Sequence, residues 1–262
     1  MKIGFVSDIH EDITRLKEAF VILKREECDE IVCLGDFVGY SVPYYAFLSS
    51  RSGHEVIKML KKNCGVMVVG NHELFAIRKL PQHKAGFSYP KDWYSLDYQT
   101  RKELSSGRIP LYEEEELPSL LSKEDETVIN TLPEYVVKEY GKIKILFSHY
   151  AFPDLAGTTT FQPKTVEDVE DHFDFMRKHH CTLAISGHDH QEGIMIFTEK
   201  SVSEVLFDTI VPLTDKLTWL HGPSVVNGGL ANGVMILDLD TMEIRAVPLN
   251  SKKHIAPEWR KL

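Results

Sequence analysis

Five short apolar runs in this sequence each lead into polar side chains of the kinds that bind metal ions. The clearest run covers residues 66–69, where Gly70 ends the run and an amide, an imidazole and a carboxylate follow. Carboxylate, imidazole and amide groups together suit borderline divalent cations better than thiolate-loving ones. The predicted metal ligands after the five runs are Asp8, His10, Asp36, Asn71, His149, His188 and His190, and His72 lies beside them.

Seven such ligands exceed what one tetrahedral metal site takes, so the sequence predicts two divalent metal ions. Manganese, iron, zinc and nickel all suit this mixture of ligands. A carboxylate that both cations share would let them lie roughly 3.5–4 Å apart. Such a pair clamps the oxygens of a phosphoryl group and lowers the pKa of a bridging water toward ~7. The predicted chemistry is therefore phosphoester hydrolysis by a metal-bridging hydroxide, with no need for a serine or cysteine nucleophile.

The apolar runs themselves are typical of buried strands in a parallel sheet. Open α/β sheets bind their ligands at the carboxyl ends of such strands, which is where the polar residues follow. Extended geometry would place Asp8 and His10 on the same side of the chain. We expect strands over residues 2–7, 30–34, 66–69, 142–147 and 183–186, with helices over 13–23, 53–63 and 164–180 between them. His179 and His180 lie at the end of the last helix, where they interact favourably with the negative pole of its dipole, and we assign them no ligand role.

The remaining segments predict a second sheet and a helical insertion. Short strands are expected over 135–138, 194–198, 224–227, 233–239 and 243–247, which indicates a second sheet packed on the first with helices outside both. Residues 74–133 are too long for a bare loop, so we expect a helical cap with helices over 74–80, 93–105 and, after a cap at Ser122, up to Leu132. The charge run from Glu113 to Glu116 is interpreted as a solvated face. No linker divides the chain, which predicts one domain over 1–262.

The bulk composition narrows the class of protein and its partners. The chain has 262 residues, 43% hydrophobic and 26% charged, as is ordinary for a soluble globular protein. Its net charge of −9 argues against nucleic acid and anionic membranes as partners. The sequence enters a strand at once and has no apolar run that spans a membrane, which predicts a cytoplasmic protein. Four cysteines without a C-x-x-C pair are interpreted as reduced structural thiols: Cys28, Cys33, Cys64 and Cys181.

Taken in order, Asp-x-His, Gly-Asp, Gly-Asn-His-Glu, a lone His and Gly-His-x-His resemble the calcineurin-like metallophosphoesterase superfamily, in its small prokaryotic form. The resemblance extends from Asp8 to His190. It implies a four-layer α/β/β/α sandwich of two mixed β-sheets flanked by helices. It also implies that Asp36 bridges the two metals and that His72 contacts phosphate and protonates the leaving oxygen. The remaining ligands divide into a first set, Asp8, His10 and His190, and a second set, Asn71, His149 and His188.

The sequence departs from the family in two places. The phosphoprotein phosphatase branch continues its Gly-Asp motif with Asp-Arg-Gly, which orients the histidine and grips phosphate. Here those positions are Gly39, Tyr40 and Ser41, which argues against a protein phosphatase although Glu73 is shared. Many small members carry Asn-Pro-Gly-Ser where this chain has Asn-Gly-Gly-Leu at 227–230, so the substrate-side loop differs.

The expected activity is hydrolysis of a small phosphorylated substrate, either a phosphomonoester or a phosphodiester. A nuclease would need a basic stripe that this acidic chain lacks. A scaffold of the same fold for protein–protein interaction is the alternative from another class, but such a scaffold usually loses ligands that this chain keeps. A redox-active di-metal protein has no sequence feature in its favour. Candidates for substrate contacts in the cap are Arg78, Lys79, Lys84, Trp93, Tyr94 and Tyr98, each of which also has an ordinary reading as a surface charge or cap-core aromatic.

Overall fold

Two six-stranded mixed sheets form the centre of the protein, as the computed structural model describes it over residues 1–250. The strand order is β11-β14-β13-β1-β2-β4 in the first sheet and β10-β9-β12-β8-β7-β6 in the second. The first sheet contains β1 (Lys2–Val6), β2 (Glu30–Cys33), β4 (Val66–Met67), β11 (Val211–Pro212), β13 (Gly233–Asp238) and β14 (Glu243–Pro248). The second contains β6 (Tyr135–Tyr140), β7 (Ile143–Ser148), β8 (Leu183–Ser186), β9 (Ile194–Thr198), β10 (Val202–Val205) and β12 (Thr218–His221).

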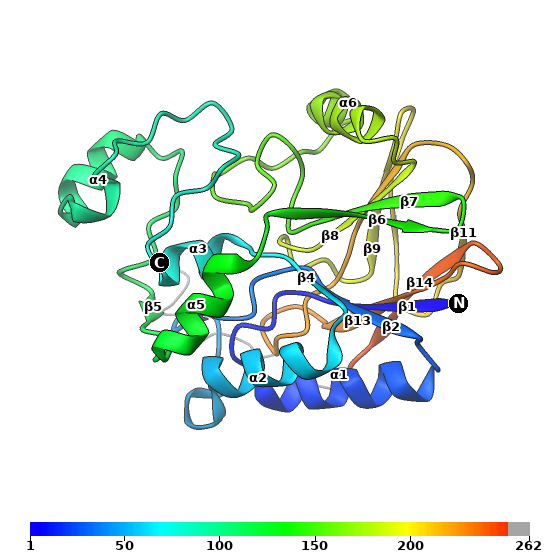
Figure 1. Cartoon of the computed structure of the whole chain (residues 1–262), viewed down its shortest axis with the longest axis horizontal. Helices are drawn as coiled ribbons and strands as arrows, with labels where there is room; N and C mark the ends of the chain where they lie inside the picture. The colour runs from blue at the N-terminus through cyan, green and yellow to red at the C-terminus, as the bar shows by residue number, and fades with distance from the viewer. Residues whose placement is uncertain (251–262) are drawn as a thin grey trace.

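Helices cover the outer face of each sheet (Figure 1). Helices α1 (Ile13–Arg25) and α2 (Gly53–Asn63) lie against the first sheet, and α6 (Glu170–Lys178), preceded by the 3-10 turn η3 (Glu167–Val169), lies against the second. Local capping starts both helices of the first layer, because the side chains of Asp12 and Ser52 accept backbone N–H groups of the first turns. The predicted four-layer α/β/β/α sandwich is confirmed.

Three apolar clusters fill the three spaces between these four layers. Alternation along each strand decides which cluster a side chain joins, because neighbouring side chains point to opposite faces of a sheet. In β1, Phe5 packs between the two sheets and Val6 packs under α1 and α2. In β7, Phe147 packs between the sheets and Leu146 packs under α6. The strands that end at the predicted ligands therefore have packed side chains on both faces.

The segment 74–133 extends from one side of the sandwich (Figure 1). It contains η2 (Trp93–Ser95), α4 (Tyr98–Ser105), β5 (Glu116–Leu117) and α5 (Lys123–Thr131), after α3 (Asn71–Ala76). Its own small apolar cluster has Phe87, Trp93 and Ile109 as its buried members. Strand β5 pairs in antiparallel fashion with β3 (Tyr40–Ser41), which follows the Gly-Asp loop; the 3-10 turn η1 (Leu48–Ser50) lies further along. We call residues 74–133 the cap from here on.

Several predicted boundaries are wrong. Residues 224–227 form no strand, although the Val225 and Val226 N–H groups donate to carbonyls at the end of β1. The expected helix over 93–105 is split after η2, because the Asp97 side chain caps a new helix at Tyr98. Helix α3 begins at Asn71 and ends at Ala76, and α6 begins only at Glu170. Strands β3, β5, β10, β11 and β12 were not expected, and β12 lies in the middle of the second sheet.

Two further expectations bear on compartment. The four cysteines lie unpaired in the structure, and Cys33 is buried in β2. Within residues 1–250, helices that combine the length and the apolar character needed to cross a bilayer are absent.

Candidate metal centre

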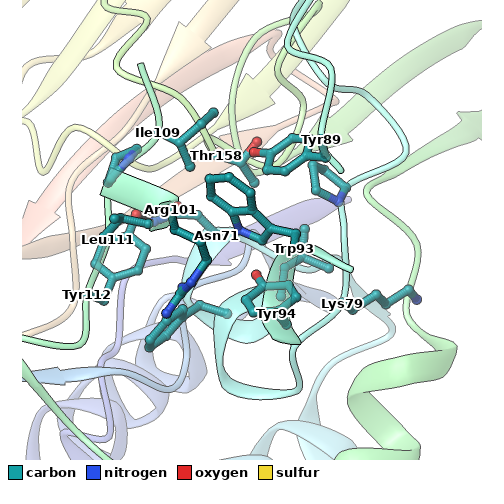
Figure 2. Close-up of a pocket in the computed structure, with 14 residues that line it drawn as sticks. Asn71, Lys79, Tyr89, Trp93, Tyr94, Arg101, Ile109, Leu111, Tyr112 and Thr158 are labelled. Atoms are coloured by element: carbon teal, nitrogen blue, oxygen red, sulfur yellow. Dashed lines mark hydrogen bonds between the residues drawn. The ribbon is translucent and has the colours of Figure 1, made fainter. Parts of the chain in front are cut away.

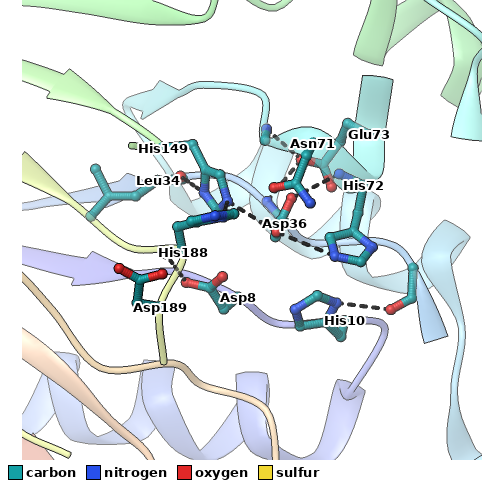
Figure 3. A network of polar contacts seen from close by, with 12 residues as sticks. Asp8, His10, Leu34, Asp36, Asn71, His72, Glu73, His149, His188 and Asp189 are labelled. Carbon is teal, nitrogen blue, oxygen red and sulfur yellow. Dashed lines mark hydrogen bonds and ion pairs between the residues drawn. The ribbon is translucent and has the colours of Figure 1, made fainter. Parts of the chain in front are cut away.

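The predicted ligands follow the ends of β1, β2, β4, β7 and β8, and their side chains come together as expected. Figure 3 labels all of them but His190. The chain does not stay extended there, which corrects the expected geometry around Asp8 and His10. Non-glycine residues avoid the left-handed region, and such conformations persist only where the surroundings hold them. Five of the seven predicted ligands nevertheless have φ between 47° and 88°: Asp8, His10, Asp36, His188 and His190.

Backbone hydrogen bonds hold the first two loops in this strained shape. The Asp8 N–H donates to the Gly35 carbonyl at 3.0 Å. The Ile9 and His10 N–H groups both donate to the Asp36 carbonyl, at 2.7 and 3.0 Å. The loop after β1 is thereby fastened to the loop after β2, so the side chains of both loops face one cleft.

Glu73 fastens the third loop to the second. Its buried carboxylate accepts four backbone N–H groups at 2.7 to 2.9 Å. Three of them belong to the Gly-Asp loop and one to Gly70, which precedes α3. A buried carboxylate costs free energy unless it is hydrogen-bonded, and these donors supply the bonds. Glu73 is therefore a structural clamp between the Asp36 loop and the Asn71 loop.

Asp8, His10 and His190 form the first group of ligand atoms. His10 Nε2 lies 3.3 Å from His190 Nε2, and Asp8 Oδ1 lies 3.4 Å from His190 Nε2. The other ring nitrogen of His10, Nδ1, donates to the Gly39 carbonyl at 2.8 Å. That bond fixes the tautomer and leaves a lone pair on Nε2, as in metal-binding histidines. The group can hold a cation.

Asp36, His149 and His188 form the second group. His149 Nε2 lies 3.0 Å from Asp36 Oδ2 and 3.1 Å from His188 Nδ1. His149 Nδ1 donates to the Leu34 carbonyl at 2.8 Å, which again leaves Nε2 with a lone pair that faces the group (Figure 3). Gly157 has φ 69°, and a Cβ there would lie 2.6 Å from the His188 ring, so glycine permits the close approach of that ring.

The side-chain amide of Asn71 completes this group. One of its two polar atoms faces His188 Nδ1, His149 Nε2 and Asp36 Oδ2 at 3.1 to 3.2 Å. The other lies 2.6 Å from the Tyr112 hydroxyl. With the nitrogen inward, the amide donates to these atoms and to the Ala156 carbonyl; with the oxygen inward, that oxygen meets only acceptors, which a cation among them would compensate. In that orientation the Asn71 amide nitrogen donates to Tyr112, so the donor set fits a metal ion.

Asp36 lies between the two groups. Besides the second group, its carboxylate comes together with His10 and His72 in a third set of ligand atoms within 4.8 Å of one another. Asp36 Oδ2 is 3.7 Å from His72 Nε2, and Asp36 Oδ1 accepts the His72 backbone N–H at 3.0 Å. The carboxylate thus reaches both halves of the cluster.

The protonation states of most of these groups suit metal binding, which needs ionised carboxylates and neutral imidazoles. Burial lowers the pKa of His10 to about 3 and that of His188 to about 4. Burial would raise the pKa of Asp8, but His190 beside it holds that pKa well below its ordinary value. His149 differs: burial would lower its pKa, but Asp36, together with Asp8 and Glu73, raises it to about 9. A cation in the second group would compete with that proton.

His72 has a different environment from the other histidines. Its Nδ1 faces the Glu116 carboxylate, and its ring lies against the Tyr112 ring with centroids 4.6 Å apart. Burial would lower the pKa of His72, but the Glu116 and Asp36 carboxylates raise it to about 10. Glu116 and Tyr112 belong to the cap, and no sequence pattern marked either of them as a site residue. The solvated-face interpretation is correct for positions 113–115 and wrong for Glu116, which is largely buried.

A cleft of about 680 Å³ opens over the cluster. Its lining includes the apolar side chains of Tyr44, Tyr45, Tyr112 and Leu230 and the carboxylates of Glu115, Glu116 and Asp189. Within residues 1–250 no lysine or arginine lines it, nor do any of the six cap residues considered for substrate contacts. Trp93 instead is buried in the apolar cluster of the cap. The 228–230 loop, which departs from the family pattern, does line the cleft.

Comparison with known proteins agrees with this geometry. The metallophosphoesterase from Sphaerobacter thermophilus has a similar fold, with a TM-score of 0.66 and 16% identity over 96% of this chain and 89% of that one. A hypothetical protein from Pyrococcus horikoshii OT3 gives a TM-score of 0.57 and 16% identity over 99% and 92%. No curated protein matches the sequence. The family model of calcineurin-like phosphoesterases matches residues 1–192, and the chain therefore belongs to the calcineurin-like phosphoesterase family.

Proposed function

We propose that this protein is a hydrolase of phosphoesters that uses two divalent metal ions. The observation that carries the proposal is the pairing of ring nitrogens in the cluster. His10 Nε2 and His149 Nε2 each face another histidine nitrogen at 3.1 to 3.3 Å, while their Nδ1 atoms donate to backbone carbonyls. Rings fixed in this way each present a lone pair to the other ligands of their own group, which is the requirement of a metal site.

Residue roles follow from the two groups. Asp8, His10 and His190 would hold one ion, Asn71, His149 and His188 would hold the other, and Asp36 would contact both. Such ions supply activation of water and compensation of the charge on phosphoryl oxygens. The chain's own residues supply the rest of the cleft. Since its described lining has no lysine or arginine, compensation of phosphate charge depends on the ions.

His72 is proposed as the general acid. Its Nδ1 faces Glu116, so its Nε2 is directed toward Asp36 and the ligand cluster. From there Nε2 would give its proton to the oxygen of the leaving alcohol as the phosphorus–oxygen bond breaks. Positioned proton donors of this kind typically contribute ~10²–10⁴ in rate. Because His10, Asp36 and His72 also come together, a ligand role for His72 is the alternative that the experiments below separate.

The proposal is tested by hydrolysis with defined metals. Protein stripped with chelator and reconstituted with manganese, iron, zinc or nickel would be assayed on p-nitrophenyl phosphate, bis(p-nitrophenyl) phosphate and nucleotides. We expect metal-dependent hydrolysis of at least one ester, which Asp36→Asn abolishes. The matched control is Asp174→Asn, an exposed carboxylate on α6 that should retain full activity. Hydrolysis that survives in Asp36→Asn, or that needs no metal, would contradict the proposal.

A further inference from the structure

A short turn of the cap contacts two neighbouring residues of the Gly-Asn-His-Glu loop. The Glu115 and Glu116 N–H groups donate to the Tyr112 carbonyl at 3.1 and 2.8 Å, which closes the turn 112–116. Tyr112 contacts the amide of Asn71 and Glu116 contacts the ring of His72. Figure 2 shows Asn71 and Tyr112 lining one pocket together with Tyr89, Trp93 and Tyr94 of the cap.

Glu116 and His72 are both withdrawn from solvent. The Glu116 side chain is 5% exposed and that of His72 is 13% exposed. Removing one member of a buried carboxylate–imidazole pair costs free energy, because the group that remains is then buried without its partner. The contact therefore favours one orientation of the His72 ring, with Nδ1 toward the cap and Nε2 toward the cluster.

The loop after Asp36 cannot provide this carboxylate itself. Gly39 occupies the position at which the related phosphatase branch has aspartate, and its φ is 88°. A Cβ at Gly39 would lie 2.5 Å from His72 Nδ1, so any side chain there collides with the ring. The partner of His72 has to come from another part of the chain.

The strand pair β3–β5 brings that partner in. Ser41 is paired with Glu116 and Tyr40 with Leu117, and the Val42 N–H donates to the Glu115 carbonyl at 2.9 Å. Arg51 holds the chain just after β5, because one of its guanidinium nitrogens donates to the Pro118 carbonyl at 2.9 Å and the other pairs with the Glu11 carboxylate at 3.1 Å. The cap strand is thus attached directly beyond the glycine that leaves room for His72.

We propose that Glu116 is a positioning residue for His72, which holds the imidazole so that its Nε2 faces the reacting ester. This inference rests on the proposed function of His72 as the general acid. A carboxylate that fixes the tautomer and orientation of a catalytic imidazole has the same role in serine proteases. Glu116 does not touch the substrate in this account, and it acts through His72 alone. The cap is then part of the catalytic apparatus as well as a wall of the cleft.

The kinetic test compares Glu116→Ala with Glu114→Ala, an exposed glutamate of the same turn. We expect Glu116→Ala to lower kcat for phenyl phosphate by about 10²-fold, with KM and metal content unchanged, and to lower kcat less for 2,4-dinitrophenyl phosphate, which leaves without protonation. Glu116→Gln should recover part of the loss, because its amide oxygen can still accept from Nδ1. Glu114→Ala should match the wild type.

A double variant separates positioning from general loss of structure. In the His72→Ala background, Glu116→Ala should cause no further fall in kcat, since both changes remove the same device. An additional loss of similar size there would overturn the proposal, and so would an unchanged kcat in the single variant Glu116→Ala.

A spectroscopic readout keeps the test independent of activity. In zinc-loaded protein labelled with 15N-histidine, Glu116→Ala should move the Nδ1 signal of His72 while the signals of His10 and His149 stay, and Glu114→Ala should move none. If the His72 signal stays in Glu116→Ala, the positioning role is wrong. If it moves in a protein that binds zinc yet hydrolyses no ester, the proposed function fails while the contact stands.

Discussion

The strand ends and the cap contribute to one cleft by different routes. Each predicted metal ligand stands within a few residues of the end of a buried strand, on a loop that backbone hydrogen bonds and Glu73 hold in place. The cap residues Tyr112 and Glu116 lie about 40 residues from the side chains they contact, and the pairing of β5 with β3 helps to bring them there. The sheets place the predicted ligands, whereas the insertion supplies the carboxylate that the His72 ring faces.

This difference suggests separate proposed roles for the two regions, metal binding at the strand ends and proton transfer under control of the cap. Changes at the strand ends should alter metal binding, and changes in the cap should alter chemistry at constant metal content. Under the proposed roles, the family fold supplies the metal centre, while the insertion adapts the proposed acid and the cleft wall to a substrate. The predictions below test that division.

The largest effect is expected from the carboxylate between the two groups. Asp36→Ala should reduce metal content from two ions toward one or none, and lower kcat by about 10³-fold or more, because each ion supplies several kcal/mol of charge stabilisation. Asn71→Ala should lose less metal, since three other ligands remain in its group. Elemental analysis after gel filtration measures both. Full occupancy in Asp36→Ala would mean that Asp36 does not bridge.

His72 should affect rate and leave metal in place. His72→Ala is expected to lose ~10²–10⁴ in kcat, or roughly 3–5 kcal/mol of barrier, with two ions retained. The loss should shrink for esters with good leaving groups. Equal losses for good and poor leaving groups would instead assign His72 to phosphate binding. Metal loss in this variant would make His72 a ligand and erase the distinction between the two regions.

Glu73 should affect stability rather than chemistry alone. Glu73→Ala leaves four buried N–H groups without an acceptor, and we expect the free energy of unfolding to fall by about 3 kcal/mol or more. Urea denaturation measures this change, with Glu114→Ala as the control, whose free energy of unfolding should fall by less than about 0.5 kcal/mol. A difference below about 1 kcal/mol between the two would show that the strand-end loops hold their shape without this clamp.

A buried histidine outside the site gives the smallest effect. His172 of α6 accepts the Phe152 N–H at 2.9 Å and packs on Trp219, and burial lowers its pKa to about 3. In the unfolded chain His172 binds a proton near pH 6.5, whereas in the folded state it stays neutral. The stability that His172 contributes is therefore full above pH 6.5 and is lost as the pH falls toward 3. Between pH 7 and 5 the wild type should lose about 2 kcal/mol more than His172→Gln. Equal losses would refute the buried neutral ring.

Sequence patterns predicted most of the fold, and the eight residues they singled out come together in the structure, because each lies beside a run whose apolar character is visible locally. Their roles as ligands and as acid stay predictions. Strand β12 was missed, since its four residues, with one threonine and one histidine, carry no clear alternation. Glu116 was missed because four consecutive glutamates do not reveal which one turns inward. The left-handed backbone conformation of Asp8, His10 and Asp36 could not be predicted from the sequence either, because it comes from hydrogen bonds between loops far apart in the chain.

The central claim is that the strand ends hold two metal ions while the cap holds His72. A crystal structure of the manganese-loaded protein, with anomalous differences measured near the manganese absorption edge, tests it most directly. We predict two anomalous peaks roughly 3.5–4 Å apart, one among Asp8, His10 and His190 and one among Asn71, His149 and His188, with Asp36 touching both. His72 should stay against Glu116. A single peak, no peak, or a peak bound by His72 would contradict the account.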